Sequence, residues 1–117
     1  MVLTDDGIVV IRDFMNADFS SGQAGTNNFP PHNNQTGLFG ASSDTLNTLS
    51  SPKVVSRNTI TVTHIITTSE ANGKIIREWE VLGNSDTTNY NRIVQWGLTK
   101  DSNTQVNMIY VFSINRV

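Results

Sequence analysis

The sequence predicts a mainly β protein: an antiparallel β-sandwich or partly open barrel with one N-terminal helix and a long ordered loop. Three observations support this class. Apolar β-branched residues alternate with polar ones in much of the second half, short turn sequences separate these stretches, and apolar residues recur at helical spacing near the N-terminus. The length of 117 residues suits a single core. We therefore expect residues 1–117 to form one domain.

The N-terminal segment predicts a helix over about residues 4–17. Thr4 is a suitable N-cap, and two acids follow in the first turn, where they suit the helix dipole. Apolar side chains then form a stripe at helical spacing, namely Ile8, Ile11, Phe14 and Met15. We interpret the stripe as the face that docks on the core, because a lone short helix is only marginally stable in water.

Residues 20–52 are the least regular part of the chain and predict a long ordered loop. Gly, Asn, Ser and Pro dominate this segment, although residues 23–26 could form a short strand. Three large apolar side chains interrupt it: Phe29, Leu38 and Phe39. We expect these three to anchor the loop to the core or, where they stay uncovered, to form an assembly interface. A mobile surface loop is the alternative.

The stretch from Thr59 to Leu82 predicts a β-hairpin. Each of its two arms alternates apolar and polar residues, which is typical of half-buried strands. Between the arms, Asn72-Gly73 supplies two residues that tolerate positive φ, as a tight type I′ turn requires. We expect Gly73 to adopt positive φ, where a side chain is costly.

Two further strands are expected after this hairpin. One covers about residues 89–99 and the other about residues 104–116. The second has apolar residues on both faces, so we interpret it as a central strand that is covered on both sides. With the hairpin, these strands predict an antiparallel meander over residues 54–117.

Candidate catalytic and metal-binding residues are few. The chain has no cysteine, which excludes disulfides, thiolate nucleophiles and cysteine-rich zinc sites. His64 lies on an apolar strand face and predicts a neutral, hydrogen-bonded core histidine. His32 follows two prolines and has no second imidazole or carboxylate at metal-ligand spacing. We therefore expect no catalytic residue, no cofactor and no metal.

Carboxylates and aromatic residues give two weaker signals. Glu78 and Glu80 point to one side of a predicted strand, which we interpret as a solvated face and not as an acid–base pair. Trp79, Trp96 and Tyr90 could form a platform for a sugar ring. Their spacing among aliphatic residues favours core positions instead.

Composition and charge argue against several classes of partner. Lys and Arg total 8 against 10 acids, a net charge of −2 without a basic run, so we expect no nucleic-acid binding. No apolar run approaches about 18 residues, so no membrane span is expected. The N-terminus carries acids where a secretory signal would carry positive charge, which predicts synthesis in the cytoplasm.

Four stretches of sequence carry a family resemblance. In order they are LTDDGIVVIRDFM, ITVTHIITTSEANGKIIREWEVL, NRIVQWGLTK and a final aliphatic strand. The chain thereby resembles small virion proteins of tailed bacterial and archaeal viruses, which are tail- or baseplate-associated components. The positions that match the family pattern best are Ser69 to Gly73, Glu78, Arg92 and Thr99-Lys100. In the loop of residues 20–52, Asn27 and Gln35 differ from the residues that the family has at these positions.

The resemblance implies a setting in the virus particle. We expect a non-enzymatic virion structural protein that forms a homo-oligomer and docks onto other virion proteins, first as a tail or baseplate component and second as a capsid-surface decoration protein. A carbohydrate-binding receptor-contact module is the alternative from another class. Exposure of Trp79 or Trp96 beside polar loops would favour carbohydrate binding. Burial of both, with apolar loop residues exposed, would favour assembly.

Overall fold

A computed structural model describes residues 3–31, 34–50 and 54–115 of the chain. Its elements in chain order are α1 (Asp5–Asp18), β1 (Phe19–Gly25), β2 (Ala41–Thr48), β3 (Val54–Val55), β4 (Thr59–Ile66), β5 (Ile75–Gly83), β6 (Thr88–Asn89), β7 (Ile93–Thr99) and β8 (Val106–Ser113).

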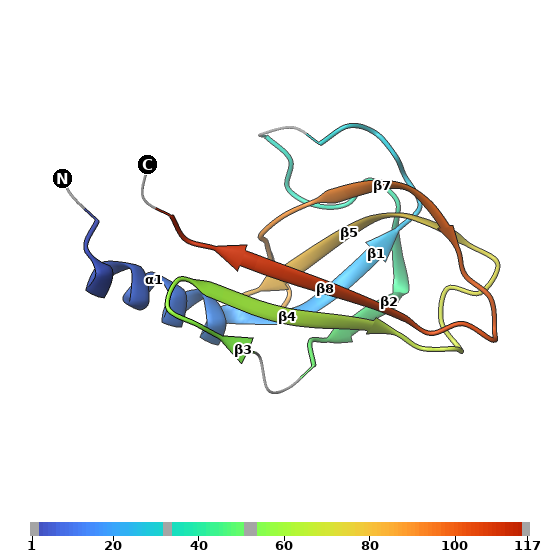
Figure 1. Cartoon of the computed structure of the whole chain (residues 1–117). Helices are drawn as coiled ribbons and strands as arrows, with labels where there is room; N and C mark the ends of the chain where they lie inside the picture. The colour runs from blue at the N-terminus through green and yellow to red at the C-terminus, as the bar shows by residue number, and fades with distance from the viewer. Residues whose placement is uncertain (1–2, 32–33, 51–53, 116–117) are drawn as a thin grey trace.

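The strands form two antiparallel sheets that stack as an open sandwich (Figure 1). The larger sheet has the order β2-β1-β5-β6, and β7 also pairs with β5. The smaller sheet has the order β3-β4-β8 and lies across β1 and β5, with α1 at one end. This arrangement confirms the predicted class, a mainly β sandwich with one N-terminal helix, and shows that it is not a closed barrel.

The core lies between the two sheets and follows from strict alternation in β4. Its apolar face is fully buried, while the threonines of the other face are half-buried. The buried side chains that meet across the sheets include Ile60, Val62, Ile66, Trp79, Val81 and Tyr110. Burying one large apolar side chain stabilises the fold by roughly 1.5–3 kcal/mol.

Helix α1 begins as predicted but docks less completely than expected. Thr4 is the N-cap, and its Oγ1 accepts a hydrogen bond from the Gly7 amide at 3.0 Å. Ile8 is buried and Met15 packs against the core, whereas Phe14 is 67% exposed. The helix projects from one end of the sandwich (Figure 1), so the sheets cover only part of its apolar stripe.

The prediction of a loop over residues 20–52 is wrong for the two strands β1 and β2, which occupy parts of that segment. Strand β1 is the central strand between β2 and β5, and β2 is the edge of the larger sheet. The β1 sequence FSSGQAG lacks apolar alternation because large side chains of the opposite sheet fill the space above it. A Cβ atom on Gly22 would lie 2.6 Å from Cγ of His64. The described residues between β1 and β2, 26–31 and 34–40, lie outside the strands.

The predicted hairpin is also wrong, although both of its strands exist. Strand β4 pairs with β3 and β8, whereas β5 pairs with β1, β6 and β7, so the segment between them crosses from one sheet to the other. Gly73 has the predicted positive φ of +81°, but the second positive-φ residue is Ala71 and not Asn72. Alternation identifies the buried face of a strand, but it does not identify its neighbour.

The meander prediction therefore fails as well. The third predicted strand is divided into β6 and β7, and β8 pairs with β4 instead of β7. Strand β8 was expected to be covered on both faces, but it lies at an edge of the smaller sheet. Ile109 and Val111 on its outer face are 60% and 63% exposed.

Candidate functional site

The best-defined site is the buried carboxylate of Glu78, which binds the backbone of the loop between β1 and β2. We call this loop, residues 26–40, the aromatic loop. Residues 32 and 33 lie outside the described residues, and so does the interpretation of His32. Glu78 Oε2 accepts hydrogen bonds from the amides of Asn27 at 2.9 Å and Gly40 at 2.7 Å. Oε1 accepts one from the amide of Phe39 at 2.9 Å. One side chain thus binds both ends of the loop.

Arg92 completes the site from the segment between β6 and β7. Its Nε donates to Glu78 Oε1 at 2.9 Å, and the two side chains are 2% and 0% exposed. The guanidinium also donates to the carbonyl oxygens of Phe29 at 2.6 Å and Asn27 at 3.3 Å. A planar guanidinium suits this arrangement because its donors point in several fixed directions at once.

The prediction of a solvated face at Glu78 and Glu80 is wrong, since both side chains are buried. Burial raises the pKa of Glu78, but the hydrogen bonds from Arg92 and the loop amides outweigh burial and lower it below its ordinary value. Burial raises the pKa of Glu80, which accepts a bond from Asn89 at 2.7 Å. Glu78 is therefore an ionised structural carboxylate at neutral pH.

The aromatic loop presents two phenylalanine rings at the surface. Phe29 and Phe39 are 59% and 49% exposed, and their ring centroids lie 5.7 Å apart at 72°. The Arg92 guanidinium lies 4.7 Å from the centroid of the Phe39 ring. The expected anchoring in the core is therefore wrong for these two residues, while Leu38 is half-buried. The structure brings two of the three assembly candidates together.

Close backbone approaches keep the base of this loop narrow. The Thr26 amide donates to the Gly40 carbonyl oxygen at 3.0 Å. A Cβ atom on Gly25 would lie 2.5 Å from both Glu78 Oε2 and the Gly40 oxygen, so only glycine fits there. In the sequence, Glu78 is predicted to lie on a solvated strand face, and Arg92 is a position that matches the family pattern. Neither position in the sequence indicates that the Glu78 and Arg92 side chains are in contact.

His64 is the buried core histidine that its strand position predicted. Its Nε2 lies 2.7 Å from the Thr45 carbonyl oxygen, which fixes Nε2 as the protonated nitrogen. Burial lowers the pKa of His64 and outweighs the opposing effects of Thr45 and Glu70. The imidazole is therefore neutral at pH 7 and is part of the core packing, in edge-to-face contact with Trp79 at 5.8 Å.

The two tryptophans have opposite environments. Trp79 is buried as predicted, whereas Trp96 on β7 is 95% exposed and does not belong to the core. The next residue, Gly97, has a φ of +125°, and the pairing register between β5 and β7 shifts in this region. This irregularity accounts for the failure of a simple alternation argument at Trp96.

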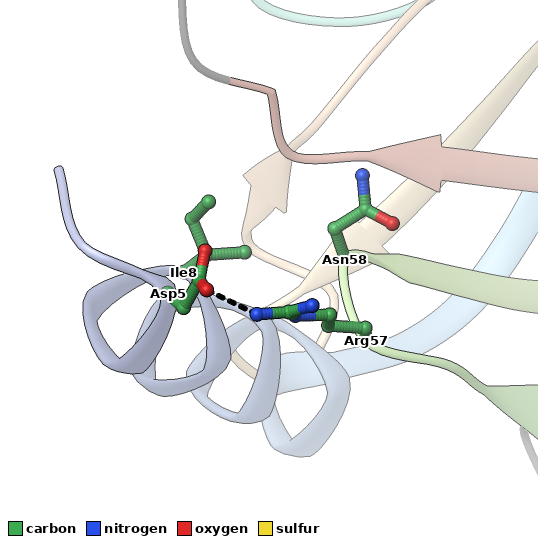
Figure 2. A pocket seen from close by; sticks show the side chains of 4 residues that line it. All are labelled: Asp5, Ile8, Arg57 and Asn58. Carbon is green, nitrogen blue, oxygen red and sulfur yellow. Dashed lines mark hydrogen bonds and ion pairs between the residues drawn. The ribbon is translucent and has the colours of Figure 1, made fainter.

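A pocket of about 260 Å³ lies between the first turns of α1 and the two residues that precede β4. The side chains that line it are drawn in Figure 2. Its lining residues are Asp5, Ile8, Arg57 and Asn58. Arg57 forms an ion pair with Asp5 across the pocket, and Arg12 donates to the Ser56 carbonyl oxygen at 2.7 Å. These contacts join the helix to the smaller sheet.

No group of three or more His, Cys, Asp or Glu side chains among the described residues could hold a metal ion. No helix among these residues is long and apolar enough to cross a membrane. Comparison of the chain with protein-family models, curated proteins and solved structures finds no match.

Proposed function

We propose that this chain is a non-enzymatic structural protein of a virus particle that associates with itself and docks onto other particle proteins. The aromatic loop is the docking element. The observation that carries this proposal is the pair of exposed rings, Phe29 and Phe39, on a backbone fixed by Glu78 and Arg92.

Fixed geometry favours binding by this loop. A flexible loop loses conformational freedom when it binds, whereas a loop already held in one shape avoids much of that cost. Burying an ion pair is itself expensive, because both charges lose their water. Here Glu78 accepts hydrogen bonds from loop amides and Arg92 donates hydrogen bonds to loop carbonyls, so the stability that the pair supplies maintains the loop shape.

Aromatic residues, phenylalanine among them, are enriched at protein interfaces relative to the rest of the surface. Large aromatic residues and arginine dominate the residues that carry binding energy. The aromatic loop combines two phenylalanines with the adjacent Arg92 guanidinium. The family resemblance supplies the particle setting, with the tail or baseplate as first location and the capsid surface as second.

The test removes the two rings and leaves the backbone contacts in place. Deleting the loop would leave Glu78 and Arg92 buried without their partners, so the double variant Phe29→Ser/Phe39→Ser is the cleaner change. The matched control is Phe14→Ser on α1, which removes one ring of similar exposure. Circular dichroism and thermal melts establish that each variant folds.

Particles assembled with each variant in place of the wild-type chain are purified on density gradients, and mass spectrometry counts the copies. We expect the loop variant to be depleted and Phe14→Ser to be retained. Normal incorporation of the folded loop variant would overturn docking through the loop. Absence of the wild-type chain from purified particles would overturn the particle role itself.

A second candidate function, carbohydrate binding, has one specific observation in its favour. The indole of Trp96 is exposed on β7, and aromatic faces stack on sugar rings. The chain has two tryptophans and Trp79 is buried, so fluorescence changes on sugar binding would come mainly from Trp96. Saturable fluorescence changes with a glycan library, lost in Trp96→Ala, would favour this candidate. No change with any glycan would remove it.

A further inference from the structure

Strand β8 has an edge built differently from the other sheet edges of the described residues. Within the described residues it pairs with β4 alone, through an unbroken register from Val106 to Ser113. Its sequence VNMIYVFS contains no charged residue and no proline. The strand therefore presents a regular row of backbone donors and acceptors along its outer side.

The other edge strands carry features that hinder pairing with another chain. Strands β3 and β6 have two residues each. Strand β2 contains Asp44, and its pairing with β1 is interrupted by a register shift. The pairing of β7 with β5 is also interrupted near Gly97. Short length, charge and bulges are the usual protection of sheet edges, and β8 has none of them.

The side chains on the outer face of β8 also distinguish it from the other edge strands. Ile109 and Val111 project there and are largely exposed, with Asn107 and Ser113 on either side of them. The neighbouring β4 residues on this face are half-buried threonines, Thr63 opposite Ile109 and Thr61 opposite Val111. The two aliphatic side chains thus lie at the rim of the sheet, where an added strand would cover them.

The pattern of β8 fits a second copy of the same strand. In an antiparallel pair related by a twofold axis at Tyr110, Ile109 lies opposite Val111 of the partner strand, and Asn107 lies opposite Ser113. Apolar residues then meet apolar ones and polar residues meet polar ones on the outer face. An axis at Ile109 would instead place Asn107 against Val111. Since the strand is uncharged, self-pairing brings no like charges together.

We propose that two copies of this chain pair antiparallel through β8 about a twofold axis at Tyr110. The pairing joins the two three-stranded sheets into one continuous sheet. Main-chain hydrogen bonds between sheet edges supply affinity, and the facing side chains fix the register. This inference rests on the self-association part of the proposed function and assigns it to a surface remote in sequence from the aromatic loop.

Charge substitutions on the outer face test the pairing. Ile109→Lys/Val111→Lys and Ile109→Glu/Val111→Glu each place like charges opposite one another in the dimer, so each should raise the dimer dissociation constant about tenfold or more. Mixing the two variants should restore a heterodimer, because the opposed charges then attract. Sedimentation equilibrium and native mass spectrometry distinguish these species.

Thr63→Lys is the matched control, because it changes the same face one strand away from the edge. It should leave the dimer intact. If Thr63→Lys weakens the dimer as much as the charge variants at Ile109 and Val111 do, the interface is the sheet face and not the edge. A wild-type chain that stays monomeric at high concentration would overturn the proposal, and so would failure of the mixed variants to associate.

The register has a separate test, since the chain has no native cysteine. Under mild oxidation, Ile109→Cys/Val111→Cys should form intermolecular disulfides, while Ile109→Cys alone should form few because its own copy is not directly opposite. Efficient crosslinking of the single variant would overturn the axis at Tyr110. If β8 pairing fails while the aromatic loop is still needed in particles, the docking role stands without this dimer. If the dimer forms but the chain is absent from particles, the dimer stands and the particle role fails.

Discussion

Glu78 and Arg92 form a buried ion pair whose other hydrogen bonds go mainly to the backbone of the aromatic loop. Nε of Arg92 lies 2.9 Å from Oε1 of Glu78, and the carboxylate accepts hydrogen bonds from three loop amides. The guanidinium donates to two loop carbonyls. The pair thus links β5 and the start of β7 to a loop that precedes both in sequence, and its loss should affect loop and fold together.

Glu78→Gln should destabilise the fold strongly. The substitution keeps the shape of the side chain, but it leaves the Arg92 charge buried without its counterion and turns an NH2 group toward amide donors. Removing one partner of a buried pair costs about 3–5 kcal/mol. Urea unfolding measures the free-energy change, and Asp5→Asn at the exposed Asp5–Arg57 pair is the control, with an expected loss below about 1 kcal/mol. Equal losses at the two sites would contradict the role assigned to Glu78.

Acid should destabilise the domain through His64. The pKa of this buried imidazole is lowered from its ordinary value of 6.5, so below pH 6.5 the unfolded chain binds a proton that the folded chain does not. The free energy of unfolding should therefore decrease as pH falls below 6.5 and level off below the folded-state pKa. Unfolding titrations at several pH values measure this slope.

His64→Leu provides the comparison for the pH series. The variant should fold at pH 7, because the replaced group is neutral and buried, and its stability should depend less on pH between 5 and 6.5 than that of the wild type. Glu80, whose pKa is raised, takes up a proton earlier in the folded state and is present in both proteins. The difference between the two pH profiles therefore isolates His64. Parallel profiles would mean that folding does not shift the pKa of His64.

Gly73→Val should cost about 1–2 kcal/mol, because a β-branched residue is disfavoured at positive φ. Gly73 has a φ of +81°, and a Cβ atom there would meet nothing within 4 Å. The expected loss is thus backbone strain alone. Gly37→Val is the control, since that position also has open space and no positive φ. Urea unfolding measures the loss. An unchanged free energy of unfolding in Gly73→Val would mean that Gly73 does not have positive φ at this turn.

The sequence predicted those elements whose pattern depends on burial alone. Strands β4 and β8 are present because their side chains alternate between a more buried and a more exposed face, and α1 begins at its predicted N-cap. Strand β5 is also present, although its side chains are buried on both faces. Strand pairing was mispredicted because a tight turn and two alternating arms are also compatible with a crossing between two sheets. Gly73 kept its predicted φ while the neighbours of both strands differed.

The candidate site was predictable only in part. Phe29 and Phe39 are conspicuous in a polar segment, and both rings are exposed. Glu78 resembled a surface residue in sequence because its cover, the aromatic loop, comes from a distant part of the chain. Strand β1 was foreseen only as a possible short strand over residues 23–26. Its pattern is hard to recognise because Gly22 leaves room for His64 of β4 and Gly25 leaves room for Glu78 of β5.

Gly22 and His64 provide the most direct test of that explanation. A Cβ atom on Gly22 would lie 2.6 Å from Cγ and 2.9 Å from Cβ of His64, so Gly22→Ala forces the imidazole or the strand to move. Overpacking of this kind costs about 1–3 kcal/mol. The imidazole is also held by Thr45 at 2.7 Å, which limits how far it can shift.

A double-mutant cycle separates this contact from a general intolerance of β1 to side chains. His64→Ala removes the ring and should by itself destabilise the core by creating a cavity. In that background Gly22→Ala should cost less than in the wild type, with a coupling energy of about 0.5–3 kcal/mol by urea unfolding. Ala24→Gly, which changes a buried β1 residue that His64 does not constrain in this way, is the control and should show no comparable coupling. Additive effects of Gly22→Ala and His64→Ala would mean that the glycine is required for another reason, and that the imidazole does not determine the small residues of β1.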